Sequence, residues 1–220
     1  MRMTTDMRSD ARQLLLLLTW MSPAFPTGAF AYSNGLEWAI ESGAVKTGNE
    51  LKVWIEDLLT RGSGWNDAVL FARCWEEDGA GLNELALALA TSRERHLETT
   101  QIGRAFRIAA GVFAVPMITD EEIAYPIAAG TACAAMNIDR EQALLAWLQG
   151  FAATLTSVAV RLVPIGQTAG LEVLRDLGPV IGAVAERAAH ATLEDLGAIT
   201  LNADIAAMRH ETQHSRVFRT

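Results

Sequence analysis

The sequence predicts an all-α protein, a single domain folded as an irregular bundle of about eight to ten helices, given typical helix lengths. Three observations predict this class. Apolar residues recur at helical spacing along almost the whole chain, helix-capping signals precede several of these segments, and no alternating run of strand length stands out. The 220 residues are 50% hydrophobic, which suits one substantial core. Breaks at 22–28, 115–116, 162–166 and 178–179 are too short to be linkers, so residues 1–220 form one domain.

The amino-terminal half contains four segments with helical character. The first runs through 14–20 after a polar start at 9–10. Thr47 and Glu50 form a capping box, and the stripe after it has helical spacing: Leu51, Trp54, Ile55, Leu58 and Leu59. Segment 82–89 is rich in Ala and Leu, and segment 97–113 carries a regular apolar face. We therefore expect helices over these ranges.

The carboxyl-terminal half begins with a capping signal at Asp139 and Gln142, followed by an apolar stripe that reaches residue 162. This stretch has no charge between Glu141 and Arg161, but its polar residues favour a buried helix of a bundle over a lipid span. Segments 170–177 and 180–193 read as two helices separated at 178–179 by a Gly-Pro pair. The last helix is expected after residue 202.

Composition excludes several classes of protein. The net charge of −8 argues against general nucleic-acid binding. Cys74 and Cys133 are isolated in apolar surroundings, as expected for buried thiols in a reducing compartment. The apolar start resembles a secretory signal, but acidic residues at positions 6 and 10 and prolines at 23 and 26 argue against it.

The segment His210-Glu-Thr-Gln-His214 is a literal H-E-x-x-H, the pattern of a zinc hydrolase helix. The commonest extended form would need Gly at 217 and His at 220, where this chain has Val and Thr. The alternative is a terminal helix whose small residues and His210 pack against another helix or a partner. We therefore assign no residue as a metal ligand, and we keep a zinc hydrolase that uses His210 and His214 as an alternative.

Two further patterns have plainer explanations than catalysis. Residues 31–35 approximate a G-x-S-x-G nucleophile elbow, but the Pro-containing segment before them cannot be a central strand. Ser33 or Asn34 is better explained as a helix cap, with Glu37 at the capping-box position. Arginines at 93, 95, 104 and 107 suggest ion pairs within the helix or toward a partner, and less readily a phosphate or GTPase-directed site.

Four segments in register resemble the UreF family of urease accessory proteins. They are Ser22-Pro-Ala-Phe-Pro-Thr-Gly-Ala-Phe-Ala-Tyr-Ser-Asn-Gly-Leu-Glu37, Arg93-Glu94 through Phe106, Arg161-Leu-Val-Pro-Ile-Gly-Gln-Thr168, and the last thirteen residues from Met208. The departures from the family's pattern, such as Ile165, Val217 and Thr220, leave the charge unchanged. The resemblance spans almost the whole chain.

The resemblance implies a non-enzymatic, all-helical cytoplasmic chaperone that forms a homodimer. It would bridge UreD and the GTPase UreG on apo-urease, and the complex would insert nickel into urease in a GTP-dependent step. No cofactor of its own is implied, since nickel would be handled by the complex. Neither nucleic acid nor membrane is an expected partner. A second alternative is regulation of UreG through an arginine such as Arg104.

The resemblance also implies where partners bind. Residues 209–220 would be a tail that docks into UreD, flexible until held, and residues 1–10 a second flexible end. Residues implied in partner binding are His210, Glu211, Arg216, Phe218, Arg219, Tyr32, Ser33 and Glu37. Arg161, Gly166 and Gln167 would fix an internal turn or line a route for the metal.

Overall fold

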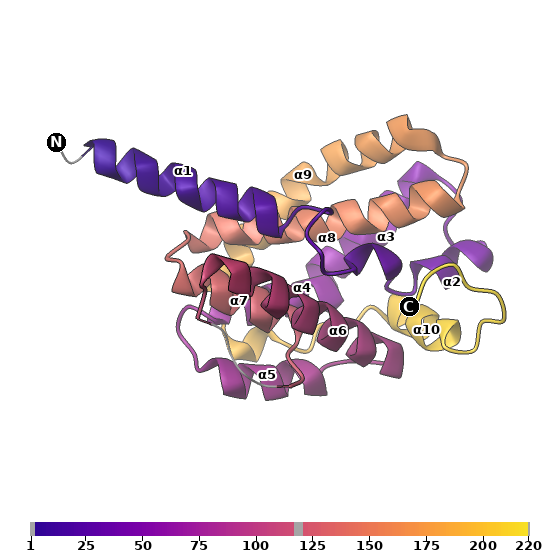
Figure 1. The fold of residues 1–220 in the computed structure, drawn as a ribbon. Helices are drawn as coiled ribbons and strands as arrows, with labels where there is room; N and C mark the ends of the chain where they lie inside the picture. The colour runs from indigo at the N-terminus through magenta and orange to yellow at the C-terminus, as the bar shows by residue number, and fades with distance from the viewer. Residues whose placement is uncertain (1–2, 117–120, 220) are drawn as a thin grey trace.

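The computed structural model describes residues 3–116 and 121–219, with the backbone alone for 3–9. Within these ranges it contains ten α-helices, three short 3-10 helices and no strand, so the expected all-α fold is confirmed (Figure 1). The α-helices are α1 (Met3–Trp20), α2 (Leu36–Glu41), α3 (Gly48–Arg61), α4 (Ser63–Arg73), α5 (Gly79–Ala88), α6 (Arg93–Ala110), α7 (Tyr125–Ala135), α8 (Arg140–Leu162), α9 (Gly166–His190) and α10 (Leu201–His210). The 3-10 helices are η1 (Ala29–Ala31), η2 (Gly111–Phe113) and η3 (Leu193–Asp195).

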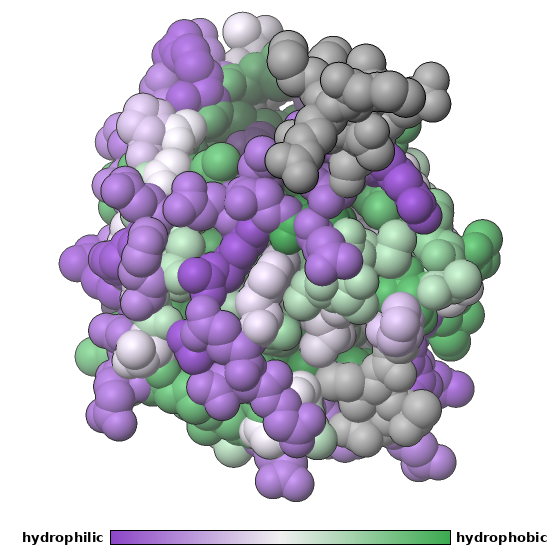
Figure 2. Space-filling view, turned by 90° about the vertical axis from the view of Figure 1, so that its left-hand side faces the viewer, coloured by the Kyte–Doolittle hydropathy of each residue, from purple (hydrophilic) through white to green (hydrophobic). Residues whose placement is uncertain are grey.

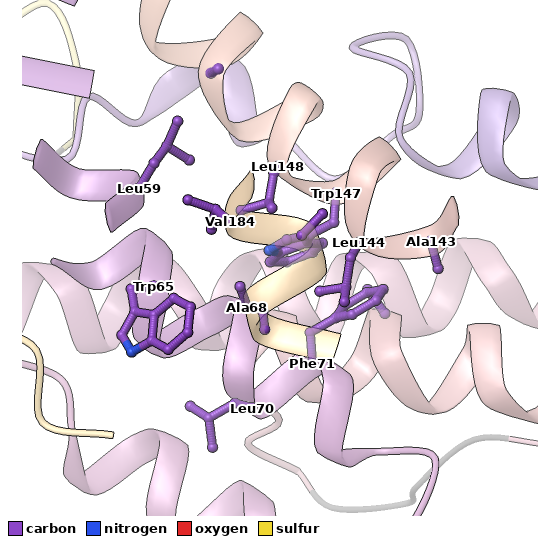
Figure 3. Packing of buried hydrophobic residues seen from close by; sticks show 14 of the residues in the cluster. Leu59, Trp65, Ala68, Leu70, Phe71, Ala143, Leu144, Trp147, Leu148 and Val184 are labelled. Carbon is purple, nitrogen blue, oxygen red and sulfur yellow. The ribbon is translucent and has the colours of Figure 1, made fainter. Parts of the chain in front are cut away.

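Helix α8 runs through the core of the bundle and packs against α9, α2 and α4. Its Trp147 ring stacks on Phe71 of α4 with 5.0 Å between ring centroids, beside Leu144 and Leu148 (Figure 3). In the described chain this is the one helix long and apolar enough to cross a membrane, and half of its most apolar window is buried within the protein. Its apolar stripe thus supplies core, as the sequence predicted.

Local capping signals account for the starts of α3, α6 and α8, whereas α9 begins without a side-chain cap. Thr47 accepts a hydrogen bond from the backbone N–H of Glu50, whose side chain bonds back to Thr47, so the predicted capping box is present. The Asp139 carboxylate accepts from the N–H of Gln142 at 2.9 Å, which confirms the second predicted cap. Ser92 caps α6 through the N–H of Arg95, so this helix begins earlier than the expected residue 97.

Helix α9 corrects one prediction. The two helices expected at 170–177 and 180–193 are a single helix, Gly166–His190, with Pro179 inside it. Proline removes one helical hydrogen bond, but Gly178 and Pro179 are exposed, where water can satisfy the freed carbonyl. Leu177 and Ile181 are buried on either side of the proline, so one apolar face continues across it. Core packing therefore outweighs the local break.

The two ends of the chain differ in how closely they pack against the body of the bundle. Helix α1 extends away from the body (Figure 1) and leaves Leu14, Leu15 and Leu18 more than half exposed. Figure 2, viewed from that side, shows hydrophobic groups at the surface between hydrophilic ones. Helix α10 starts at Leu201, slightly before the expected residue 202, and ends at His210. Residues 211–219, called the tail below, fold back onto the body.

Candidate functional site

The tail returns to the amino-terminal loop, residues 21–35, and closes a contact between the two ends of the sequence. The N–H of Arg219 donates to the carbonyl oxygen of Ala31 at 2.8 Å. The Phe218 side chain is buried at 4% exposure and belongs to the main hydrophobic core. The tail loop is visible in yellow beside α2 and α10 in Figure 1. Its aromatic anchor is thus held within this chain.

The amino-terminal loop is shaped by two glycines in the left-handed region. Gly28 has φ 75° and Gly35 has φ 77°, a conformation that other residues adopt at a cost. A Cβ placed on Gly35 would lie 2.7 Å from the backbone nitrogen of Ala207, so α10 packs directly on this glycine. The N-cap of α2 is Gly35 and has no side-chain cap hydrogen bond, so the expectation that Ser33 or Asn34 caps this helix is wrong. The hydroxyl of Ser33 does accept from the N–H of Glu37 at 3.3 Å, two residues before the N-cap.

Glu37 on α2 is the acceptor that holds the tail backbone. Its carboxylate is buried and accepts from the N–H groups of Val217 at 2.7 Å and Phe218 at 2.8 Å. It also lies 3.2 Å from Nε2 of His210. Buried carboxylates are stable when several donors converge on them, and two backbone N–H groups converge here beside the His210 ring.

Glu94 on α6 is the second buried carboxylate. One oxygen lies 2.7 Å from Nδ1 of His210 and the other accepts from Arg216 at 2.7 Å. The backbone N–H of Glu94 donates in turn to Glu211 at 3.3 Å. Glu37, Glu94, His210 and Arg216 are called the tail lock from here on, because they join α2, α6, α10 and the tail.

Aromatic and amide contacts surround the tail lock. The Arg161 guanidinium of α8 lies over the Phe218 ring, 4.6 Å from its centroid, and reaches the carbonyl oxygen of Phe30 at 3.4 Å. The Gln101 side-chain oxygen of α6 accepts from the Tyr32 hydroxyl at 2.7 Å and from Arg219 at 3.2 Å. These contacts tie the loop, α6, α8 and the tail together.

The geometry removes the basis of the zinc alternative. Helix α10 ends at His210, so His214 does not lie one turn further along the same helix. His210 is fully buried with both ring nitrogens facing carboxylates, whereas His214 is exposed. Among the side chains that the structure describes, those of residues 10–116 and 121–219, no group of three or more His, Cys, Asp or Glu is placed to hold a metal ion.

The structure brings together most residues that the sequence singled out for partner binding. His210, Glu211, Arg216, Phe218 and Arg219 meet Tyr32, Ser33 and Glu37 around the tail. Arg161 joins this group, but Gly166 and Gln167 lie exposed at the start of α9. No hydrogen bond links either of these two to the tail in the part of the chain described. The partner-binding roles, the metal route and the flexibility of residues 1–10 and 209–220 stay predictions, with residues 1–2 and 220 outside the described ranges.

Two participants were missing from the expected site, Glu94 and Gln101. Both lie in the second of the four segments quoted for the family resemblance, so the sequence carried a signal for them. Their pairing with residues more than 100 positions away could not be deduced from helical spacing.

A second charged group lies on the inner side of α6. Arg95 pairs with Glu98 and lies 3.8 Å from Asp67 of α4. These three side chains line a cavity of about 150 Å³ whose wall includes Trp20, Tyr125 and Trp147, among others. Burial raises the pKa of Asp67 to about 6, an effect that the Arg95 charge only partly offsets.

Cys74 and Cys133 are also buried, and burial raises the pKa of both thiols, so neither is a reactive thiolate.

Comparison with known proteins identifies close relatives. The UreF family model matches residues 45–178. The chain is 45% identical to the urease accessory protein UreF of Methylobacterium sp. (strain 4-46), over 94% of this chain and 88% of that protein. It is 44% identical to UreF of Sinorhizobium medicae, over 96% and 98%, and 44% identical to UreF of Brucella ovis over the full length of both.

Proposed function

The chain belongs to the UreF family of urease accessory proteins, and on that premise we propose that it acts in urease maturation as a non-enzymatic cytoplasmic chaperone. In this proposal it bridges UreD and the GTPase UreG on apo-urease. The complex assembles the dinuclear nickel centre in a step coupled to GTP hydrolysis by UreG. Nickel is the cargo of the complex.

The observation that carries this proposal is the composite surface formed by the tail and the amino-terminal loop. The tail lock fixes the tail backbone, and the side chains of Val217 and Arg219 are exposed to solvent. Val217 is 66% exposed and Phe30 of the loop is 64% exposed, so both offer apolar surface to a partner. Arg219 is also exposed, and arginine beside apolar anchors is typical of protein interfaces.

This arrangement changes which tail residues we propose for partner contact. Phe218 and His210 are buried in their own chain, so their contribution to binding is to hold the tail in place. Val217, Arg219 and the half-exposed Arg216 are the side chains available to UreD or UreG. A partner would then meet a tail that is already folded on α2 and α6.

The proposal is tested by charging this surface without disturbing the tail lock. Val217→Asp keeps the backbone N–H that Glu37 accepts and changes only an exposed side chain. We expect loss of co-purification with UreD and UreG and loss of urease activation in cells. The matched control is Leu171→Asp on α9. The Leu171 side chain is 67% exposed, and the residue is remote in sequence from the tail and the amino-terminal loop. Normal complex formation by Val217→Asp would contradict the role of this surface.

We also propose that the chain acts as a homodimer, which the exposed leucines of α1 support. Three large apolar side chains on one extended helix are costly in water and are stabilised by a partner surface. Light scattering of the purified chain should give twice the monomer mass, with Leu15→Asp shifting it toward the monomer. An unchanged mass for this variant would place the dimer contact elsewhere.

The alternative role, regulation of UreG through Arg104, is favoured by the exposure of Arg104 on α6. An arginine that acts on a partner's nucleotide must be accessible. GTP turnover by UreG in the complex is measured with the Arg104→Ala variant. An unchanged turnover number counts against this residue.

A further inference from the structure

We propose that His210 is doubly protonated in the folded chain and that its charge state controls whether the tail stays docked. The number of N–H donors that a histidine offers depends on its charge. A neutral imidazole has one N–H, while the imidazolium ion has two. In the tail lock, Nδ1 lies 2.7 Å from a Glu94 oxygen and Nε2 lies 3.2 Å from a Glu37 oxygen. Two ionised carboxylates at these positions can both be satisfied only by the imidazolium.

Charge balance leads to the same assignment. The tail lock contains two buried carboxylates, and its other cation is Arg216. With a neutral imidazole it would keep one uncompensated negative charge next to a fully buried ring, which is costly. With the imidazolium, two cations face two anions. The other ionisable groups on these elements are Glu41 of α2; Arg93, Arg95, His96, Glu98, Arg104 and Arg107 of α6; Arg140, Glu141 and Arg161 of α8; Asp204 and Arg209 of α10; and Glu211, His214 and Arg219 of the tail.

His210 and the tail backbone share one partner, the Glu37 carboxylate, so the charge on His210 affects how firmly the tail is held. The Glu37 carboxylate that faces Nε2 also accepts the N–H groups of Val217 and Phe218. Loss of the second imidazole proton removes one attraction and leaves Glu37 and Glu94 facing each other without a cation between them. The tail is therefore held while His210 is charged, and its hold weakens as the pH rises through the deprotonation of the folded form. This device is separate from the proposed partner contacts, because it acts within the chain alone.

The direct test is the nitrogen-15 spectrum of the histidine side chains in the full-length protein. At pH 7.5 we expect His210 to give the signature of two protonated ring nitrogens. The matched comparison is His214, four residues away and exposed, whose side-chain signals are followed in the same spectra. A single neutral tautomer at His210 at this pH would overturn the proposal. This measurement requires no variant and no partner protein.

The effect on the tail is measured as hydrogen-exchange protection of the amides of Val217 and Phe218, corrected for the intrinsic pH dependence of exchange. We expect protection to fall about tenfold or more over the interval in which His210 loses its second proton, the size of a lost charge-assisted hydrogen bond. In His210→Gln, which cannot carry a charge, protection should be low and independent of pH. His214→Gln should behave like the wild type. Constant wild-type protection through the deprotonation of His210 would overturn the proposed control. Because these readouts involve neither UreD nor UreG, they succeed or fail independently of the proposed function.

Discussion

At the scale of single residues, the tail depends on a carboxylate that lies far from it in the sequence. Glu37 accepts two tail N–H groups and faces Nε2 of His210, so one buried carboxylate meets three groups of the carboxyl-terminal segment. Replacing it with Gln removes the charge and puts a donor where an acceptor is needed. We expect tail docking to weaken by about 1.5–3 kcal/mol, the range for hydrogen bonds to charged groups.

The measurement for Glu37→Gln is exchange protection of residues 217 and 218 at constant pH. Glu41→Gln is the control on the same helix, since Glu41 is exposed and touches the tail only through Gln213. Exposed polar contacts contribute little to stability. Equal protection in the two variants would show that Glu37 does not hold the tail.

A second residue-scale prediction compares two glycines with nearly the same backbone conformation. Gly28→Ala should cost about 1–2 kcal/mol, because φ stays positive while a Cβ there meets no atom within 4 Å. Gly35→Ala adds a collision 2.7 Å from the α10 backbone, so it should cost about 1–3 kcal/mol more. Urea unfolding of both variants gives the difference. Equal losses would mean that α10 moves aside without cost.

At the scale of elements, α9 carries a proline whose effect on the helix is local. Pro179→Ala gives residue 179 a backbone N–H that can donate to the carbonyl oxygen of Arg175, on an exposed face and without altering the buried stripe. We expect the free energy of unfolding to rise, by up to about 3 kcal/mol. Gly178→Ala, on the same exposed turn, should raise it by about 0.5–1 kcal/mol through helix propensity alone. A lower melting temperature for Pro179→Ala would show that the helix needs the bend.

The elements also show which features of the fold the sequence could predict. The caps at Thr47 and Asp139 depend on residues three positions apart, and the apolar stripes on residues three and four apart, so both were predictable. The break at Pro179 was predicted wrongly, because its cost is outweighed by tertiary packing on both sides. The tail lock joins positions 116 and 173 residues apart, a pairing that no local pattern encodes. Only the family resemblance pointed to that group of residues.

At the scale of the whole molecule, α6 lies between two charged groups. One side of the helix supplies Glu94 to the tail lock, and its inner side supplies Arg95 and Glu98 to the cavity. In the first group, Glu94 pairs with Arg216 of the tail at 2.7 Å. The second keeps Asp67 at 3.8 Å from its nearest cation, so Asp67 is less well compensated than Glu94. Stability of the body should therefore respond to pH through Asp67.

The sign of that response follows from the pKa of Asp67. In the folded chain it is raised to about 6 from the ordinary value of 3.8, so the folded chain binds this proton more tightly than the unfolded chain. The contribution of Asp67 to stability is therefore unfavourable above pH 6 and is relieved as the pH falls from 6 toward 4. Asp67→Asn, which cannot ionise, should be more stable than the wild type by about 1–3 kcal/mol at pH 7.5, and the difference should shrink on acidification. Urea unfolding of the wild type and Asp67→Asn from pH 7.5 to pH 4.5 measures this difference in stability. Asp176→Asn is the control, because the hydrogen bond from Arg175 lowers the pKa of the Asp176 carboxyl. Its difference from the wild type should therefore have the opposite sign. A difference that is constant with pH would mean that Asp67 is solvated in the folded protein.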